Sequence, residues 1–387
     1  MRTIEAAGLT IGPDAPPRVM GVLNVSRESP YSPSVYDDPG EAAAYVDEEL
    51  IGEGADIVDV GLESANKRLD VLSAEQELDR LDTAVEAMES TSGDAVWSIE
   101  TRYAEVAEAA LDAGYDMVND ICGFADPRMP AVCQERDAAV CKMASPPDLE
   151  RPGAVDDVDW TARRSRAWLD RSTYVDRVYE ALKQNGFTEK TVVDPAFGGW
   201  SERKTVADDR ELFRRLEEFR EFDRPILVSI NRKNFLRQLT DRSTEEALPV
   251  SLAATSMAVE RGARILRTHD VRETVDAATV GDTFAGDADT GAVADADDGV
   301  SVREVKTGTG GGPDRAGERV FAVSGLTAAA AGELARAAAA VDAVAWGGPG
   351  PDGLLLSVDG EAVGALAGRL PATPRLATVA DRLRAHE

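Results

Sequence analysis

The chain has few cysteines and no long apolar run. Its three cysteines, Cys122, Cys133 and Cys141, are odd in number and lack the Cys-x-x-Cys spacing of a zinc site. We therefore expect neither disulfides nor structural zinc, and a reducing cytoplasm as the compartment. No run of 18 apolar residues occurs, and residues 1–17 lack a basic-then-apolar leader. We accordingly expect neither a membrane span nor secretion.

Lysine is also scarce, although the chain is strongly charged. The 387 residues carry 71 acidic and 42 basic side chains, which gives a formal net charge of −29. Only seven of the basic residues are lysines, so 35 are arginines. Such a surface repels nucleic acid and anionic lipid, and we expect neither as a partner. An acidic, lysine-poor composition is typical of a salt-rich cytosol, which is our hypothesis of a halophilic protein.

Eight short apolar runs recur along the chain, and stretches of helical length separate them. Runs rich in valine and isoleucine suit parallel strands that are buried on both faces. Eight strand–helix units predict an α/β fold, a (β/α)8 TIM barrel, with its active site at the C-terminal ends of the strands. The runs are residues 19–25, 55–60, 95–99, 116–121, 138–143, 191–197, 225–230 and 264–268.

Several stretches between the runs carry helix signals. Ser73 and Gln76 have the spacing of a capping box, and Gly54 follows an expected helix as a C-terminal cap does. The expected helices cover residues 39–53, 73–89, 103–113, 126–135, 160–185, 209–222, 244–261 and 271–284.

The composition divides the chain into three parts. Residues 1–284 hold the expected barrel, and residues 285–317 are rich in Asp, Ala, Gly and Thr, as a linker is. The glycines at 310–312 lack the spacing of a phosphate-binding loop. Residues 318–387 are expected to form a small α+β domain, whose role the sequence does not indicate.

Polar residues stand at or near the C-terminal ends of the apolar runs, so the barrel would gather them in one place. Some have ordinary structural explanations. An asparagine is a common turn former, Asp120 is expected to cap its own loop, and Lys142 is equally well explained as a rim lysine. The set is Asn24, Glu63, Glu100, Asn119, Asp120, Lys142, Asp194, Lys233 and His269.

The chemistry of these groups suits a polar heterocycle and a phosphate leaving group. The Asp194 carboxylate can accept two hydrogen bonds from a cyclic amidine, as in a guanine-like or pterin ring, and Asn119 offers both a donor and an acceptor. Lys233 and a nearby arginine, Arg267, supply positive charge. His269 can donate to an oxyanion.

A metal ion is expected at one of the strand ends. The side-chain oxygen of Asn24 is a suitable ligand for a hard cation such as Mg²⁺, which would hold phosphate oxygens and keep waters. We therefore expect Mg²⁺ as the cofactor, with Asn24 as its protein ligand.

At these positions the sequence resembles the dihydropteroate synthases. The resemblance runs in one order from about residue 19 to residue 283. Each motif alone is weak, but their ordered conjunction is specific. The motifs are Met-Gly-Val-Leu-Asn-Val at 20–25, Gly-Ala-Asp-Ile-Val-Asp-Val-Gly at 54–61 followed by Glu63-Ser64, Asn119-Asp120-Ile121, Asp194-Pro195, Arg232-Lys233, and Arg267 with His269-Asp270.

The resemblance implies a (β/α)8 barrel that joins 6-hydroxymethyl-7,8-dihydropterin diphosphate to 4-aminobenzoate, giving dihydropteroate and diphosphate in folate synthesis. It also implies a homodimer. In this reading diphosphate leaves first, a stabilised pterin cation forms, and the arylamine nitrogen attacks it. The partners would be these small molecules or a related arylamine.

Site residues carried over by the resemblance fall into two groups. The pterin ring would be held by Asp194, Asn119 and Lys233, with Glu100 at its other side. Arg267 would flank the pterin plane. The diphosphate and its Mg²⁺ would be faced by Asn24 and His269, and Ser64 belongs to a substrate loop. The predicted catalytic residues are Lys233, Arg267 and His269.

Two loops depart from the family pattern, which leaves the second substrate open. They are residues 26–31 and residues 65–68, where Arg27, Lys67 or Arg68 would supply a cation. Glu100 also replaces the family's shorter aspartate. Two other functions remain: a pterin-binding methyltransferase-type barrel that serves a corrinoid partner, and a non-catalytic pterin-binding relative.

Overall fold

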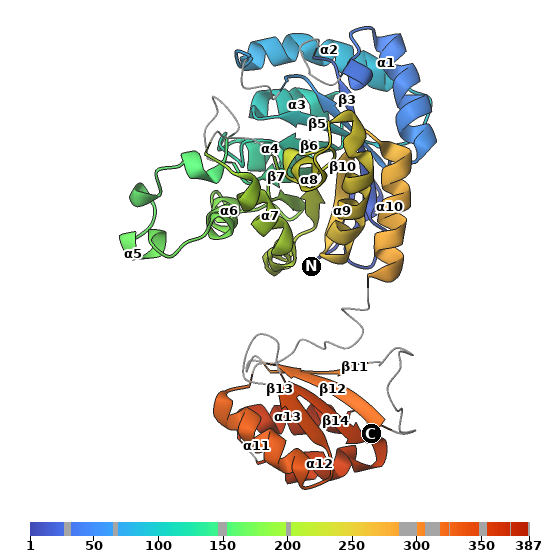
Figure 1. The fold of residues 1–387 in the computed structure, drawn as a ribbon. Coiled ribbons are helices and arrows are strands. Elements are labelled where there is room, and N and C mark those ends of the chain that lie inside the picture. Colours follow the sequence, from blue (N-terminus) through green and yellow to red (C-terminus); the bar gives the residue numbers. More distant parts are fainter. Residues whose placement is uncertain are drawn as a thin grey trace. The chain divides into compact units, whose positions relative to one another are not determined.

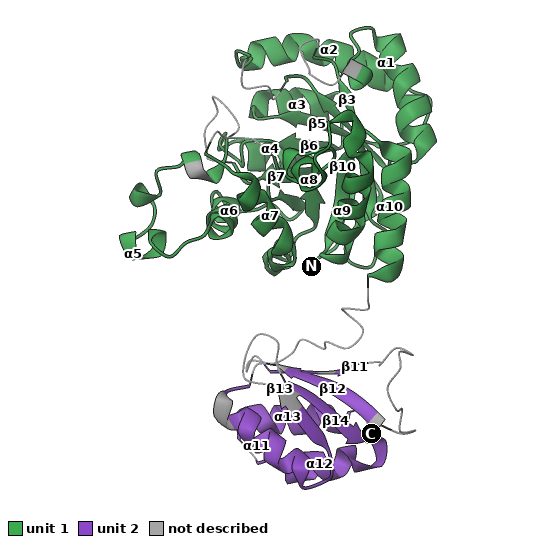
Figure 2. Cartoon of the chain, viewed as in Figure 1, with its two compact units in different colours: residues 1–286 green, residues 287–387 purple. Residues whose placement is uncertain are grey.

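The computed structural model describes most of the chain, and the contacts divide it into two compact units. Unit 1 covers Met1–Gly286 and unit 2 covers Asp287–Glu387 (Figure 2). Each unit is considered by itself below. The described residues are 1–26, 32–64, 69–145, 153–198, 203–285, 300–305, 318–324, 326–347, 354–371 and 373–385.

Unit 1 is a closed barrel of eight strands, surrounded by helices (Figure 1). All neighbouring strands are parallel, and β10 pairs with both β3 and β9 to close the ring. The predicted (β/α)8 fold is confirmed. The strands are β3 (Arg18–Asn24), β4 (Ile57–Gly61), β5 (Val96–Thr101), β6 (Met117–Asp120), β7 (Ala139–Met143), β8 (Thr191–Asp194), β9 (Ile226–Val228) and β10 (Ala263–Thr268).

The helices of unit 1 follow the strands in turn. The capping box predicted at Ser73 and Gln76 is present, and Gly54 ends its helix in a left-handed conformation with φ of 104°. Among the described residues, no helix combines the length and the apolar character needed to cross a bilayer. The helices are α1 (Pro39–Tyr45), α2 (Ala74–Ser90), α3 (Ala104–Asp112), α4 (Met129–Glu135), α5 (Arg166–Leu169), α6 (Tyr174–Lys183), α7 (Val206–Arg214), α8 (Asn234–Thr240), α9 (Leu248–Glu260) and α10 (Val271–Phe284).

The prediction of one helix over residues 160–185 is wrong. A 3-10 turn, Trp160–Ala162, is followed by α5 and, after a break, by α6. Two side chains start new helices inside the predicted segment, because Ser165 caps α5 and Thr173 caps α6 by accepting hydrogen bonds from backbone N–H groups. Helix α8, which follows the Arg232-Lys233 pair, was not predicted.

The N-terminal end of the barrel is closed by a hairpin that the sequence analysis also missed. Strands β1 (Ile4–Ala6) and β2 (Leu9–Ile11) pair antiparallel. Their buried side chains join Met20, Ile57 and other inward-facing strand residues in one apolar cluster. The N-terminal (lower) half of the barrel interior is therefore filled with apolar side chains, which leaves the C-terminal (upper) half for a ligand site.

Unit 2 is a four-stranded antiparallel sheet with helices and an apolar core of its own. The sheet order is β11-β12-β14-β13, and β11 lies within the predicted linker. The linker prediction is thus wrong at residues 301–305, which pair with β12, while residues 286–299 and 306–317 lie outside the described residues. The elements are β11 (Ser301–Val305), β12 (Glu318–Ser324), α11 (Ala328–Ala339), β13 (Val344–Gly347), β14 (Leu354–Asp359), α12 (Val363–Arg369) and α13 (Pro374–Arg384).

Candidate active site

The strand register brings distant polar residues into one row. Asn24 aligns with Gly61, Gly61 with Glu100, and Glu100 with Asn119, across four neighbouring strands. Asp194 is the last residue of β8, at the same end of the barrel. The expectation that strand ends gather the candidate residues is confirmed for these positions.

A buried hydrogen-bond network connects the row to β10. Asp59 Oδ2 accepts hydrogen bonds from Asn119 Nδ2 at 2.9 Å and from Arg267 Nε at 2.7 Å. Asp59 Oδ1 accepts one from Ser98 Oγ at 2.6 Å, and Arg267 Nη2 donates to Glu100 Oε2 at 2.7 Å. Asp59 and Ser98 were not among the predicted site residues, although a carboxylate inside the apolar run of residues 55–60 was a visible signal.

Arg267 lies between two carboxylates, which fixes its charge. Burial alone would lower the pKa of its guanidinium, but Glu100 and Asp59 raise that pKa above its usual value. Burial raises the pKa of the Glu100 carboxyl, while Arg267 opposes the rise. The site therefore keeps a fixed, desolvated cation beside a carboxyl group that gains a proton more readily than usual.

Asp194 is buried at the end of β8, where a backbone N–H and nearby cations face its carboxylate. Its Oδ1 accepts a hydrogen bond from Ala196 N at 2.7 Å. Burial raises the pKa of Asp194 to about 6, while the Ala196 N–H and Lys233 oppose the rise. The carboxylate is ionised at neutral pH and can accept hydrogen bonds from a ligand with adjacent N–H groups.

Lys233 lies at the start of α8, close to the loop that follows β8. That loop passes Gly198 with φ of 109°, and a Cβ placed there would lie 3.0 Å from Lys233 Nζ, so only glycine allows the approach. Burial, and then Arg267, lower the pKa of Lys233. The buried Lys204 steadies the same loop by donating to Ala196 O at 2.6 Å and pairing with Asp209 at 2.7 Å.

Arg232, the neighbour of Lys233, has a structural role. Its Nε and Nη2 donate to the two carboxylate oxygens of Asp270, each at 2.8 Å. This bidentate pair ties the loop after β9 to the loop after β10. It also holds the backbone on which His269 sits.

Two other candidates lie away from the ligand-facing row. Lys142 faces the helix layer and donates to the carbonyl oxygens of Leu182 and Gly186 at 2.9 and 2.8 Å, so it caps the C-terminal end of α6. Asp120 accepts from two backbone N–H groups of the loop that follows it, at 2.8 and 2.7 Å. Asp120 thus caps its own loop as expected, whereas the explanation of Lys142 as a rim lysine is wrong, because its side chain is fully buried and holds a helix end.

Glu63, two residues after β4, has structural partners. It pairs with Arg102, which is buried between Glu63 and Glu77, and accepts a hydrogen bond from Leu72 N at 2.9 Å. Ser64 follows as a buried residue. Arg27, Lys67 and Arg68, the predicted sources of a further cation, lie outside the described residues.

Asn24 and His269 flank the outer part of the site. Asn24 Nδ2 donates to Ser34 Oγ at 2.9 Å, and a Cβ on Gly61 would lie 2.7 Å from Asn24 Oδ1. Burial, and then Arg267, lower the pKa of His269 to about 3. The imidazole is therefore neutral at neutral pH and has one N–H to donate.

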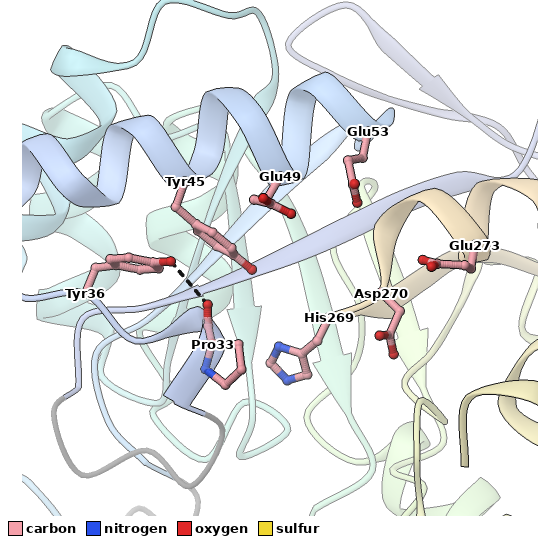
Figure 3. A pocket seen from close by; sticks show the side chains of 8 residues that line it. All are labelled: Pro33, Tyr36, Tyr45, Glu49, Glu53, His269, Asp270 and Glu273. Atoms are coloured by element: carbon pink, nitrogen blue, oxygen red, sulfur yellow. Dashed lines mark hydrogen bonds between the residues drawn. The ribbon is translucent and has the colours of Figure 1, made fainter. Parts of the chain in front are cut away.

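A cavity of about 480 Å³ opens beside His269 (Figure 3). In Figure 3 the imidazole lies between Pro33 and Asp270, and α10 contributes Glu273 to the lining. The stacked rings of Tyr36 and Tyr45, with centroids 4.8 Å apart, form an aromatic side of the cavity. Among the described residues, four carboxylates, those of Glu49, Glu53, Asp270 and Glu273, also line the cavity, and His269 is the one candidate site residue in its lining.

Comparisons with known proteins agree with this geometry. The family model described as pterin binding enzyme matches residues 20–269. The dihydropteroate synthase of Escherichia coli is 32% identical over 273 residues, which cover 68% of this chain and 90% of that protein. A probable bifunctional folylpolyglutamate synthase/dihydropteroate synthase of Halobacterium salinarum is 35% identical over 70% of this chain, which spans about a third of that relative's length, 32%.

The fold comparison gives the same result. A dihydropteroate synthase structure from Coxiella burnetii, in complex with pteroic acid, superimposes with a TM-score of 0.58 at 28% identity. The match covers 72% of this chain and 96% of that one. The chain belongs to the pterin binding enzymes, the family of these dihydropteroate synthases.

Proposed function

We propose that this chain is a dihydropteroate synthase of folate synthesis, which joins 6-hydroxymethyl-7,8-dihydropterin diphosphate to 4-aminobenzoate. The observation that carries the proposal is the set formed by Asp194, Asn119, Lys233 and Arg267 at the C-terminal end of a closed barrel. This set provides acceptors for a pterin edge beside two cations, in a chain whose relatives are dihydropteroate synthases.

In this mechanism the ring is held before any bond breaks. Asp194 accepts from the amidine donors of the pterin, and Asn119 and Lys233 meet its other polar atoms. Because Asp194 and Asn119 are buried, the ring edge that they hold is shielded from water.

The leaving diphosphate is stabilised by groups that are already in place. As the bond to diphosphate breaks, negative charge grows on its oxygens, and the pterin carries the positive charge. The neutral His269 donates its N–H to that developing charge, and Arg267 lies nearby as a fixed cation. The arylamine nitrogen then forms the new bond to carbon and loses its proton.

The residues present fit a bound Mg²⁺. The described residues contain no group of three His, Cys, Asp or Glu that would cage a metal, and Mg²⁺ commonly takes one or two protein oxygens together with phosphates and waters. Because Asn24 Nδ2 is engaged with Ser34, the amide oxygen is the end available to a cation. When bound, the ion supplies charge neutralisation for the diphosphate.

The direct test is an assay of the purified chain in high salt. Pterin diphosphate, Mg²⁺ and 4-aminobenzoate are supplied together and then one at a time withheld. We expect diphosphate release that requires the arylamine. Tight pterin binding without turnover would instead indicate a non-catalytic relative, and methyl transfer from a methyl-pterin to a corrinoid protein would indicate the methyltransferase. Other arylamines, used in the same assay, identify the second substrate.

We also propose a cytoplasmic homodimer. The three cysteines are buried and unbridged, which suits a reducing compartment. The dimer follows from the family resemblance alone. Light scattering of the purified chain tests it, and a monomer at assay concentrations would contradict it.

A further inference from the structure

Asp59 has no place in the reaction as described, yet it lies at the centre of the site's polar network. It is fully buried, two residues before the end of β4. Its carboxylate accepts hydrogen bonds from side chains of three other strands, namely Ser98, Asn119 and Arg267. Two of these, Asn119 and Arg267, are residues assigned to the pterin.

The chemistry of a carboxylate dictates how Asn119 is oriented. A carboxylate accepts hydrogen bonds and donates none, so Asn119 must turn its NH2 group toward Asp59. Its carbonyl oxygen is then left for the other side. A neutral partner in place of Asp59 would allow both orientations of the Asn119 amide. The ligand would then meet the carbonyl oxygen in some molecules and the NH2 group in others.

Arg267 is fixed in the same way. Its Nε donates to Asp59 and its Nη2 donates to Glu100, both at 2.7 Å, so two edges of the planar guanidinium are held. The plane of the cation is thereby set before a ligand enters, which is the condition for strong electrostatic stabilisation.

We propose that Asp59 is a positioning residue of the pterin site, which sets the orientation of the Asn119 amide and of the Arg267 plane. This inference rests on the proposed function and deepens it. The competing explanation is that Asp59 only balances the charge of Arg267. In that case it affects the stability of the protein and not its affinity for the pterin ring.

A double-mutant cycle separates the two explanations. The variants D59N, N119A and D59N/N119A are made in the full chain, and the Kd for 6-hydroxymethylpterin is measured by its fluorescence. If Asp59 acts through Asn119 as well as through Arg267, D59N raises Kd about tenfold in the native background and about threefold or less in the N119A background, where only the Arg267 contact is left to lose. An equal rise in both backgrounds overturns the proposal.

A paired exchange covers the outcome that D59N fails to fold. N119D alone places two carboxylates against each other, whereas D59N/N119D restores one amide and one carboxylate in the same contact. We expect the exchanged pair to bind the pterin at least about fivefold more tightly than N119D. Equal affinities would overturn the proposal.

Asp56 provides a matched control. It lies just before the same strand, pairs with Arg18 at 3.1 Å, and is at the opposite end of the barrel. D56N should leave the Kd unchanged, and a rise equal to that of D59N would overturn the specific role of Asp59. An unmodified chain that binds no pterin overturns the proposed function and this proposal together. If the unmodified chain binds the pterin but the effects of D59N and N119A on Kd are additive, only the role of Asp59 is overturned.

Discussion

The two halves of the barrel interior use the same strands for opposite purposes. Ile57 and Asp59 are both on β4 and both fully buried. Ile57 packs in the apolar cluster under the hairpin, whereas Asp59 joins the polar network two residues further on. The comparison teaches that burial alone does not define function in this barrel. The position of a residue along its strand does define it, because only the upper half of the interior holds charged side chains in fixed positions at the ligand site.

The largest effect is expected in the lower half. Ile57→Ala removes a fully buried side chain from the apolar cluster. It should lower the free energy of unfolding by about 2–5 kcal/mol, measured by denaturant titration. Pterin affinity of the folded variant should stay the same. A marked loss of affinity at unchanged stability would abolish the division between the halves.

Lys233→Ala should give the opposite result. We expect kcat to fall by about 100- to 1000-fold, because a cation beside Asp194 and Arg267 is lost. The free energy of unfolding should change little, since burial already disfavours this charge. Circular dichroism melting serves as the control. Turnover close to that of the native chain would remove Lys233 from the catalytic residues.

Asp194→Asn should weaken pterin binding by about 2–4 kcal/mol, since an amide matches a pair of ring donors poorly. The measurement is direct titration with the pterin. An unaltered Kd would place the ring elsewhere in the barrel.

Pterin affinity should also depend on pH. Burial raises the pKa of Asp194 to about 6, so the carboxylate that accepts the ring donors is ionised above that pH and protonated below it. The Kd should therefore rise about tenfold for each pH unit below 6. In Asp194→Asn this dependence should become shallower. The same slope in both proteins would assign the titration to another group.

Salt should change the stability of the protein and leave its affinity for the pterin nearly unchanged. With a net charge of −29, the free energy of unfolding should increase from low to molar potassium chloride as repulsion is screened. The Kd for a neutral pterin should change less than about twofold, because the ligand has no net charge and Arg267 is already paired with Asp59 and Glu100. Stability that does not respond to salt would contradict the halophilic hypothesis.

Much of the fold could be predicted from the periodic spacing of apolar residues. Apolar runs ending in Asn24, Asp194 and similar residues were sufficient to predict a barrel and one shared site, because parallel strands are continuous in sequence. The break at Ser165 and Thr173 was missed, since local capping competes with helical periodicity and both signals are weak. Strand β11 was missed because its pairing with β12 is decided by distant residues.

The sequence by itself determined which polar residues lie at the C-terminal ends of the strands, because each of them comes at or after the end of an apolar run. Only the tertiary structure decided what each does. The sequence left the role of Lys142 open and did not separate Arg232 from its neighbour Lys233, but the fold gives Lys142 a helix end and Arg232 the Asp270 carboxylate as partners. Asp59 was hidden within its strand until β5, β6 and β10 placed donors around it. The reason is physical: a buried charge acquires its role from its neighbours, and in a closed barrel those neighbours come from distant parts of the chain.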